Sequence, residues 1–238
     1  MSKITAIVIP IYKQEMSPSE QISFERALKV FPESDIIIVS PKSLNLDNYL
    51  AVESNLKIET FDDYFFENIA GYNEMMLSVK FYKRFLNYQY ILIYQLDAYV
   101  FENQLDYWEK ANYDYVGSPW LISPQIASNK EPKVNIQHWF VNRVGNGGLS
   151  LRKVKTHYWT MIFYWILIKF FPLNEDMFLG ILMDFINPFF KKPKAMEALK
   201  FAFEMQPRQS FELNNYQLPF GVHAWEKYDP EFWKEWIK

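Results

Sequence analysis

The stretch YILIYQLDAYVF, residues 90–101, decides the fold class. Its first five residues are apolar or aromatic, which is typical of a strand buried on both faces of a parallel sheet. An acid, Asp97, interrupts the apolar run. Because an ionised carboxylate in a dry interior is costly unless it is paired, we expect Asp97 to lie where the strand leaves the sheet and to bind a cation there. From the residue alone, the alternative is a carboxylate that caps a turn or pairs with a nearby lysine.

The segments before this strand repeat one pattern. Residues 4–11, 35–39 and 56–61 are short apolar, β-branched runs, and residues 19–31 and 72–87 have helical spacing. Strands that alternate with helices predict an open, Rossmann-like α/β sheet, mostly parallel, with helices on both faces. In such sheets ligands bind outside the carboxyl ends of the strands. This rule favours a functional role for the acid in the opening stretch.

The second half of the chain is less regular, and no linker divides it from the first. We therefore expect one domain over residues 1–238. The expected elements are a short strand and turn at 113–120, a tight turn and strand at 145–152, a helix at 158–171, a helix at 174–184 with Asn174 as its N-cap, and a short helix from Asp229.

Composition excludes several classes of protein. Half of the 238 residues are hydrophobic and 19% are aromatic, so the chain folds into a globular core. The net charge of −3 argues against general nucleic-acid binding. Without cysteine the chain has no disulfide and no thiolate site. No apolar run reaches the roughly 20 residues that span a bilayer, and a strand begins too early for a signal peptide. We expect a cytoplasmic protein that touches the inner face of the membrane.

Four short segments carry the residue types that chemistry needs. They are QLD (95–97), GNGG (145–148), NED (174–176) and PFGVHAW (219–225). A hard divalent cation takes oxygen ligands, and a histidine joins them for Mn²⁺. Asp97 and His223 supply one ligand of each kind, and diphosphate oxygens and water can complete the shell. The alternative for His223 is a hydrogen-bonded histidine in an aromatic pocket.

The other two segments are ambiguous by themselves. Gly147 and Gly148 allow close backbone approach or a positive φ, and a plain hairpin turn is the alternative. Glu175 and Asp176 stand at a helix start, where acids are ordinary capping residues. One of these carboxylates can instead act as the general base that takes a proton from an acceptor hydroxyl.

Taken together and in order, seven segments resemble a known family. They are AIVIPIYKQEMSPSEQISFERALKVF (6–31), IIIVSPKSLNLDNYL (36–50), GYNEMMLSVKFYKRFLNYQYILIYQLDAYVF (71–101), YDYVGSPW (113–120), GNGGLSLR (145–152), NEDMF (174–178) and PFGVHAW (219–225). The family is bacterial, is catalogued as a domain of unknown function, and is similar to GT-A-type glycosyltransferases. The resemblance runs from Ile4 to about Trp225.

This resemblance implies a GT-A fold and a metal-dependent transfer of a sugar from a nucleotide-sugar to a glycan or lipid-linked acceptor. UDP is the favoured nucleotide by analogy. Residues 1–101 are then the nucleotide-binding half, and residues 102–238 the acceptor and catalytic half. The implied pathway is the assembly of bacterial surface polysaccharide such as lipopolysaccharide.

The resemblance also assigns residues. An Asp-x-Asp motif ends a central strand in GT-A enzymes, and Gln95-Leu96-Asp97 occupies that place, with Gln95 where many of these enzymes have an acid. Asp97 and His223 are the implied ligands of Mn²⁺ or Mg²⁺, and Asp176, ahead of Glu175, is the implied base of an inverting reaction. The implied donor-site residues are Pro10, Ile11, Tyr12, Lys13, Asn73, Lys80, Tyr94, Gln95, Leu96, Asp97, Asn146, Gly147 and Gly148.

An aromatic segment adds a candidate partner. Residues 158–171 are rich in Trp, Tyr and Phe and follow the basic residues Arg152, Lys153, Lys155 and His157. Aromatic side chains beside cations are typical of a membrane interface. Peripheral membrane contact from Arg152 to Phe171 and from Phe189 to Lys194 is therefore one interpretation. A core helix buried on all sides is the other, and it is the one that an all-round apolar segment favours.

Two rival functions remain. A sugar nucleotidyltransferase shares a similar sheet but needs a Gly-rich loop after the first strand, and residues 11–21, IYKQEMSPSEQ, contain no glycine. A non-catalytic module that binds glycan or nucleotide on the same fold is the second rival, and Gln95 keeps it open. The sequence predicts neither the sugar nor the oligomeric state.

Overall fold

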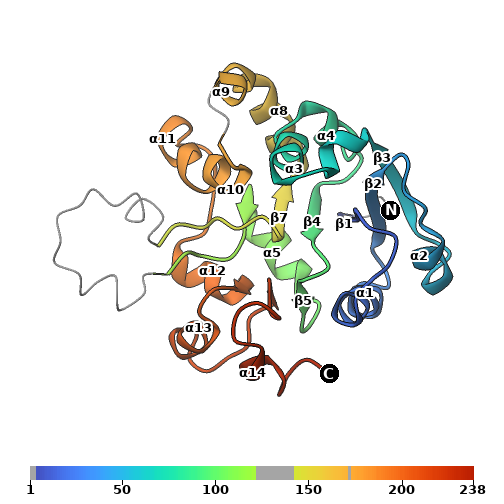
Figure 1. Cartoon of the computed structure of the whole chain (residues 1–238). Helices are drawn as coiled ribbons and strands as arrows, with labels where there is room; N and C mark the ends of the chain where they lie inside the picture. Colours follow the sequence, from blue (N-terminus) through green and yellow to red (C-terminus); the bar gives the residue numbers. More distant parts are fainter. Residues whose placement is uncertain (1–3, 122–141, 171–172) are drawn as a thin grey trace.

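The computed structural model describes residues 4–121, 142–170 and 173–238, which form an α/β structure (Figure 1). Its main sheet has six strands in the order β3-β2-β1-β4-β7-β6. In chain order they are β1 (Thr5–Pro10), β2 (Asp35–Pro41), β3 (Lys57–Phe61), β4 (Tyr90–Tyr94), β6 (Tyr115–Val116) and β7 (Leu149–Lys153). The pairs among β1 to β4 are parallel, and β7 runs antiparallel to both β4 and β6. The mostly parallel sheet is confirmed.

The opening stretch forms β4, near the middle of this sheet. All five of its residues are buried, because β1 and β7 flank the strand and helices cover both faces. The carboxyl ends of β1, β2 and β4 meet at one edge, since these strands are parallel. Asp97 therefore leaves the sheet at the edge where ligands bind in α/β folds.

Helices form a layer on each face of the sheet. Figure 1 shows α3, α4 and α8 together on one side and α1 on the other. The helical segments are α1 (Pro18–Val30), α2 (Asp47–Val52), η1 (Asp63–Phe66), α3 (Ile69–Met76), α4 (Val79–Lys83), α5 (Leu105–Ala111), α8 (Val154–Phe163), α9 (Trp165–Phe170), α10 (Glu175–Met177), η2 (Phe178–Leu182), α11 (Met183–Ile186), α12 (Ala195–Phe201), α13 (Pro207–Leu213) and α14 (Pro230–Trp233).

Two expected helices differ from the structure. The segment 72–87 is two helices, α3 and α4, because the Ser78 hydroxyl accepts a hydrogen bond from the Phe81 N–H at 3.1 Å and starts a new helix. The segment 158–171 begins earlier, at Val154, and its described part is divided into α8 and α9 at Tyr164. That segment is not buried on all sides, since several of its aromatic side chains face outward. No helix of the described ranges is long and apolar enough to cross a bilayer.

A second, three-stranded sheet brings the C-terminal segment to the site. It has the order β5-β9-β8, with β5 (Tyr99–Val100), β8 (Ala202–Phe203) and β9 (Gly221–Val222). Strand β5 follows the Asp97 turn, and β9 pairs with it antiparallel. Because His223 comes directly after β9, this pairing places its ring beside the end of β4.

Candidate functional site

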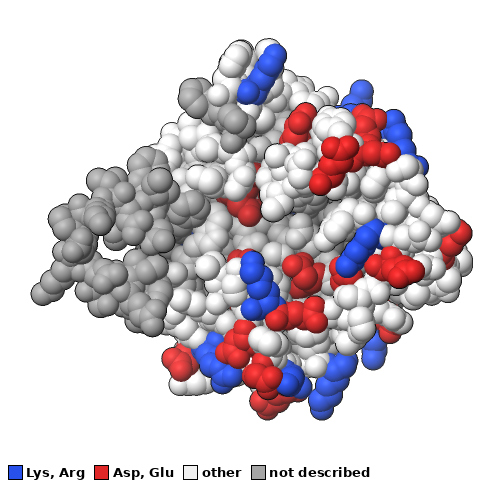
Figure 2. All heavy atoms as spheres, viewed as in Figure 1, with Lys and Arg blue, Asp and Glu red and all other residues white. Residues whose placement is uncertain are grey.

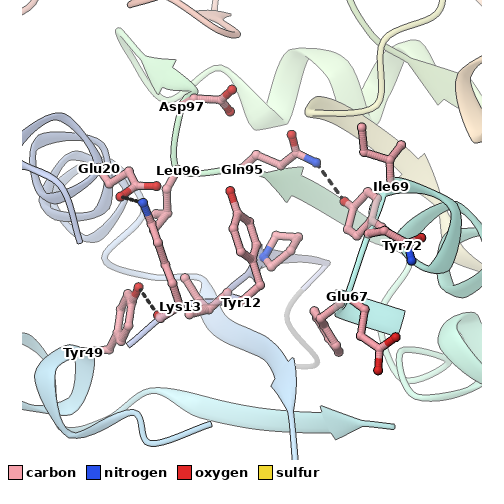
Figure 3. A pocket seen from close by; sticks show the side chains of 14 residues that line it. Tyr12, Lys13, Glu20, Tyr49, Glu67, Ile69, Tyr72, Gln95, Leu96 and Asp97 are labelled. Atoms are coloured by element: carbon pink, nitrogen blue, oxygen red, sulfur yellow. Dashed lines mark hydrogen bonds and ion pairs between the residues drawn. The ribbon is translucent and has the colours of Figure 1, made fainter. Parts of the chain in front are cut away.

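A cavity of about 460 Å³ opens at the carboxyl ends of β1 and β4 (Figure 3). Figure 2 shows acidic and basic atoms around the hollow in the middle of this face. Its lining comes mainly from the ends of β1 and β4 and from η1 and the start of α3, with one residue each from α1 and α2. The lining residues are Pro10, Ile11, Tyr12, Lys13, Glu20, Tyr49, Phe66, Glu67, Asn68, Ile69, Tyr72, Gln95, Leu96 and Asp97. Seven of these are residues that the sequence pointed to.

One wall of the cavity is built by the loop after β1. Tyr12 is exposed, and in Figure 3 its ring extends toward Gln95 and Leu96. The Lys13 ammonium pairs with the Glu20 carboxylate at 2.7 Å, and the Tyr49 hydroxyl donates to the Lys13 carbonyl at 3.0 Å. The ion pair and the tyrosine hold the loop in place. A planar ring can stack on the exposed face of Tyr12.

The far end of the cavity holds a cluster around His223. Its Nε2 lies 3.2 Å from Asp97 Oδ1 and 3.2 Å from Gln95 Oε1. Its Nδ1 lies 3.2 Å from Glu204 Oε1. The Gln95 amide nitrogen donates to the Tyr72 hydroxyl at 3.1 Å, which turns the amide oxygen toward the imidazole. Three donor atoms of Gln95, Asp97 and His223 therefore converge at one point.

The two carboxylates of this cluster set the charge of the imidazole. Burial disfavours the charged ring, but hydrogen bonds from the ring to Asp97 and Glu204 outweigh it and raise the pKa of His223 to about 10. Burial acts to raise the pKa of Asp97, and the His223 imidazolium reverses this and lowers it. Without a competing cation, the cluster contains an ionised carboxylate beside an imidazolium.

The two glycines lie between this cluster and the acid pair. A Cβ on Gly148 would lie 2.0 Å from His223 Nε2, and a Cβ on Gly147 would lie 2.3 Å from Glu175 Oε2. Neither glycine has a positive φ, whereas Asn146 has φ 63°. Of the two explanations for the glycines, the structure supports close backbone approach.

The acid pair begins α10, and its two members have different surroundings. Glu175 is buried and pairs with the fully buried Arg152, with 2.7 Å between Oε1 and Nη2. The same guanidinium donates to the Tyr82 hydroxyl at 3.1 Å, to the Ser150 hydroxyl at 3.0 Å and to the Gly147 carbonyl at 3.3 Å. Glu175 is thus fixed by a buried network, and this network also holds the glycine turn.

Burial raises the pKa of the Glu175 carboxyl above its ordinary value, with Arg152 opposing and the neighbouring Asp176 adding to the rise. Asp176 is only partly buried, and its carboxylate lies beside that of Glu175. The less buried Asp176 is therefore the member of the pair that a hydroxyl from outside can reach.

A residue from α3 caps the acid pair. The Glu175 N–H donates to Asn73 Oδ1 at 2.9 Å, and the Asn73 amide donates to the Ile69 carbonyl at 2.9 Å. Asn174 stands at the N-cap position, but its side chain makes no capping hydrogen bond. Asn73 therefore positions the acid pair, and it does not line the cavity.

Six of the implied donor-site residues do not line the cavity: Asn73, Lys80, Tyr94, Asn146, Gly147 and Gly148. Two of them, Lys80 and Tyr94, make their contacts away from it. The Lys80 ammonium pairs with Asp62 at 2.7 Å on the surface. The Tyr94 side chain is fully buried and donates to the Ser23 carbonyl at 2.8 Å. Both side chains make structural contacts. The prediction that they bind the donor gains no support from this placement.

Sequence reasoning missed Glu204, Tyr72 and the role of Arg152. Glu204 stands in a segment without a recognisable motif. Tyr72 begins the predicted helix 72–87, and nothing in that pattern indicates that its hydroxyl meets Gln95. Arg152 reads as part of a basic flank, but it is fully buried, as is His157. The role of Arg152 could have been predicted from its position, because an arginine inside the apolar strand 149–153 needs a buried acid as its partner.

The cluster at the end of the cavity fits a divalent cation. Among the described residues, no three His, Cys, Asp or Glu side chains gather as a metal site. Two such side chains, Asp97 and His223, do lie together, and the Gln95 amide oxygen beside them is a third donor. Glu204 accepts from Nδ1, which leaves Nε2 for a metal, as is common around ligating histidines. One nitrogen and two oxygens are a donor set that Mn²⁺ accepts.

Comparison with solved structures supports the fold. The structure resembles that of the galactosyltransferase LgtC in complex with donor and acceptor sugar analogs, with a TM-score of 0.54 and 13% identity over 92% of this chain and 86% of that one. It also resembles the bifunctional glycosyltransferase WbbM, with a TM-score of 0.54 and 11% identity over 97% of this chain and 47% of that one. The predicted GT-A fold is confirmed.

At the level of sequence, no curated protein matches the chain. A model of a family described as a protein of unknown function, DUF5672, matches residues 55–223. These residues include the QLD, GNGG and NED segments and His223. The chain belongs to the DUF5672 family and has the fold of GT-A glycosyltransferases.

Proposed function

We propose that the chain is a metal-dependent glycosyltransferase that moves a sugar from a nucleotide-sugar, UDP-sugar in the first instance, to a glycan or lipid-linked acceptor. The observation that carries this proposal is the convergence of Asp97, Gln95 and His223 at the end of the cavity. A GT-A fold alone fits many functions. Three converging donor atoms beside a cavity of about 460 Å³ favour, among these functions, one that takes a metal-bound nucleotide.

In the proposed reaction each group has one task. The nucleoside lies in the cavity against Tyr12, and its diphosphate reaches Asp97 and His223. A bound Mn²⁺ or Mg²⁺ would supply charge stabilisation to the leaving diphosphate. Lys13 lines the same cavity, although its ammonium pairs with Glu20.

The acid pair acts on the acceptor. The hydroxyl oxygen of the acceptor attacks the anomeric carbon while the bond from that carbon to the diphosphate oxygen breaks. The hydroxyl proton passes to Asp176, and the diphosphate leaves with the electron pair. A base on the face opposite the leaving group gives inversion, which we favour. Gly147 and Gly148 lie between the two groups and lack side chains that would separate donor and acceptor.

A thermal-shift panel tests the donor half of the proposal. UDP, GDP, CMP and dTDP are each added with Mn²⁺ or with EDTA. A ligand at about 100 times its dissociation constant adds about 2.7 kcal/mol of stability, which corresponds to roughly 5–10 °C at this chain length. We expect a shift with one nucleotide that EDTA and Asp97→Asn abolish and that Asp106→Asn, an exposed acid on α5, leaves intact.

The panel and a turnover assay also separate the rival functions. A non-catalytic module binds the nucleotide but transfers no sugar to any acceptor. A sugar nucleotidyltransferase releases pyrophosphate from a nucleoside triphosphate and a sugar phosphate. A flat panel with a folded protein would overturn the proposed donor.

A further inference from the structure

We propose that the outward face of α8 and α9 docks on an anionic phospholipid surface. Four apolar side chains, Trp159, Phe163, Ile166 and Phe170, are exposed by 53%, 73%, 54% and 67%. Trp159 and Phe163 are four residues apart on α8, and Ile166 and Phe170 are four residues apart on α9, so each helix carries two of these side chains on one face. We call these four residues the apolar stripe.

The apolar stripe lies on the outer side of helices whose inner side is already packed against the core. The opposite side of α8 packs into the core through Val154 and Met161. Tyr164 at the junction and the partly buried Ile168 of α9 pack against the same core. The Tyr164 hydroxyl also donates to the Ile186 carbonyl at 3.1 Å, which fixes the junction of the helices on α11. Within the stripe, the rings of Trp159 and Phe163 stack with centroids 5.9 Å apart. The helices therefore stay in place while the stripe faces outward.

The charge around the stripe favours lipid as the occupant. No Asp or Glu stands between Val154 and Phe170, although acids outnumber bases in the chain as a whole, 28 to 25. Lys155 and Lys169 are exposed at the two ends of this segment. In Figure 2 the surface over α9, at the top, carries basic atoms and no acidic ones. Exposed aromatic side chains with lysines beside them bind at the headgroup level of anionic bilayers.

The helices lie on the membrane in this proposal and do not cross it. α8 and α9 are short, and no described helix is long and apolar enough to span a bilayer. Five peptide steps lead from Phe170 to Glu175 at the acid pair, and such a length spans at most about 18 Å. A surface that holds the stripe would therefore lie within about 18 Å of the acid pair.

Vesicle co-sedimentation tests the docking surface and needs no turnover. The probes are phosphatidylcholine vesicles with and without phosphatidylglycerol. We expect binding to the anionic vesicles that salt weakens. Phe163→Ser/Phe170→Ser should lower this binding at least about tenfold, because each substitution removes an exposed ring that would be buried in the lipid. Lys155→Ala/Lys169→Ala should also weaken binding, and Phe163→Trp/Phe170→Trp should retain it.

Val52→Ser/Met196→Ser is the matched control, since it removes two exposed apolar side chains elsewhere, from α2 and α12. This control should bind as the unmodified chain does. Three results would overturn the proposal: no binding to anionic vesicles, equal binding to neutral ones, or equal binding by the two serine pairs. A dimer in solution that only Phe163→Ser/Phe170→Ser dissociates would also overturn it, because the stripe would then be covered by a second copy of the chain.

Discussion

His223 Nε2 lies 3.2 Å from Asp97 Oδ1, although the two residues come from opposite halves of the chain. Asp97 is placed by the end of β4 and His223 by the pairing of β9 with β5. The contact thus depends on both sheets at once. It lies at the far end of the proposed donor site, and Gly148 beside it leaves the room that the imidazole ring needs.

Gly148→Ala should therefore disturb the cluster without any change of charge. The added Cβ would lie 2.0 Å from His223 Nε2, so the ring must move. We expect a loss of about 1–3 kcal/mol of stability and a weaker Mn²⁺-dependent nucleotide shift. Denaturant unfolding of Gly148→Ala, His223→Ala and the double variant measures this. In the His223→Ala background, Gly148→Ala should cost much less stability than it does in the unmodified chain. Strictly additive losses would show that residue 148 does not contact the His223 ring.

Asp176→Asn separates binding from chemistry. The amide keeps the shape of the side chain but cannot accept the proton of the acceptor hydroxyl. We expect turnover to fall by about 10²–10⁴, while the nucleotide shift stays unchanged. Steady-state kinetics gives the comparison, with Asp106→Asn as the control acid. Full activity in Asp176→Asn would remove Asp176 as the base.

Arg152→Leu should be among the most destabilising single changes. It leaves Glu175 buried without its cation and removes the donor to Tyr82, Ser150 and Gly147. Loss of one partner of a buried ion pair costs about 3–5 kcal/mol. Urea unfolding of Arg152→Leu and of Arg152→Leu/Glu175→Leu tests this, since the double variant should lose less than the sum of the single losses. As a control, Glu231→Gln in the exposed pair with Lys234 should change stability little.

Asn73→Ala should affect turnover more than nucleotide binding. Asn73 accepts from the Glu175 N–H at 2.9 Å and so holds the start of α10. Loss of such a cap costs about 1 kcal/mol. Ser78→Ala, which removes the cap of α4, should cost a similar amount but leave kcat unchanged. Equal kcat for the two variants would show that Asn73 does not position the acid pair.

His157 makes stability depend on pH. Burial, with the positive charge of Arg152 adding to it, lowers the pKa of His157 to about 3, and its Nδ1 donates to the Lys153 carbonyl. The folded-state pKa lies below the unfolded value of about 6.5, so the unfolded chain takes up the proton first as the pH falls. Each pH unit between about 6.5 and 3 should therefore cost about 1.4 kcal/mol of stability.

Urea unfolding at pH 5, 6, 7 and 8 measures this dependence, with His157→Gln as the comparison. The variant lacks the titrating ring, so its stability should fall less than that of the unmodified chain below about pH 6.5. Identical slopes for the two proteins would exclude His157 as the source. Above about pH 7 the ring is neutral in both the folded and the unfolded chain, so His157 should add no pH dependence to the stability of either protein.

Some of the molecule follows from the sequence because it depends on local pattern. Apolar β-branched runs that alternate with segments of helical spacing predict the parallel part of the sheet. Asp97, three residues after the apolar run 90–94, predicts the edge of the sheet where the ligand site lies. The Asp229-Pro230 pair predicts the start of α14, where the Asp229 side chain accepts from the Phe232 N–H. Such features need only neighbours in the chain.

Only the tertiary structure determines which distant segments pair with one another. That Arg152 is a buried partner of Glu175, that Asn73 caps α10 in place of Asn174, and that Glu204 holds His223 all depend on contacts between elements far apart in sequence. The aromatic segment shows the same limit, since its composition fits a core helix and a surface helix equally. Only the packing of α8 and α9 determines which of its faces is buried and which is left for a partner.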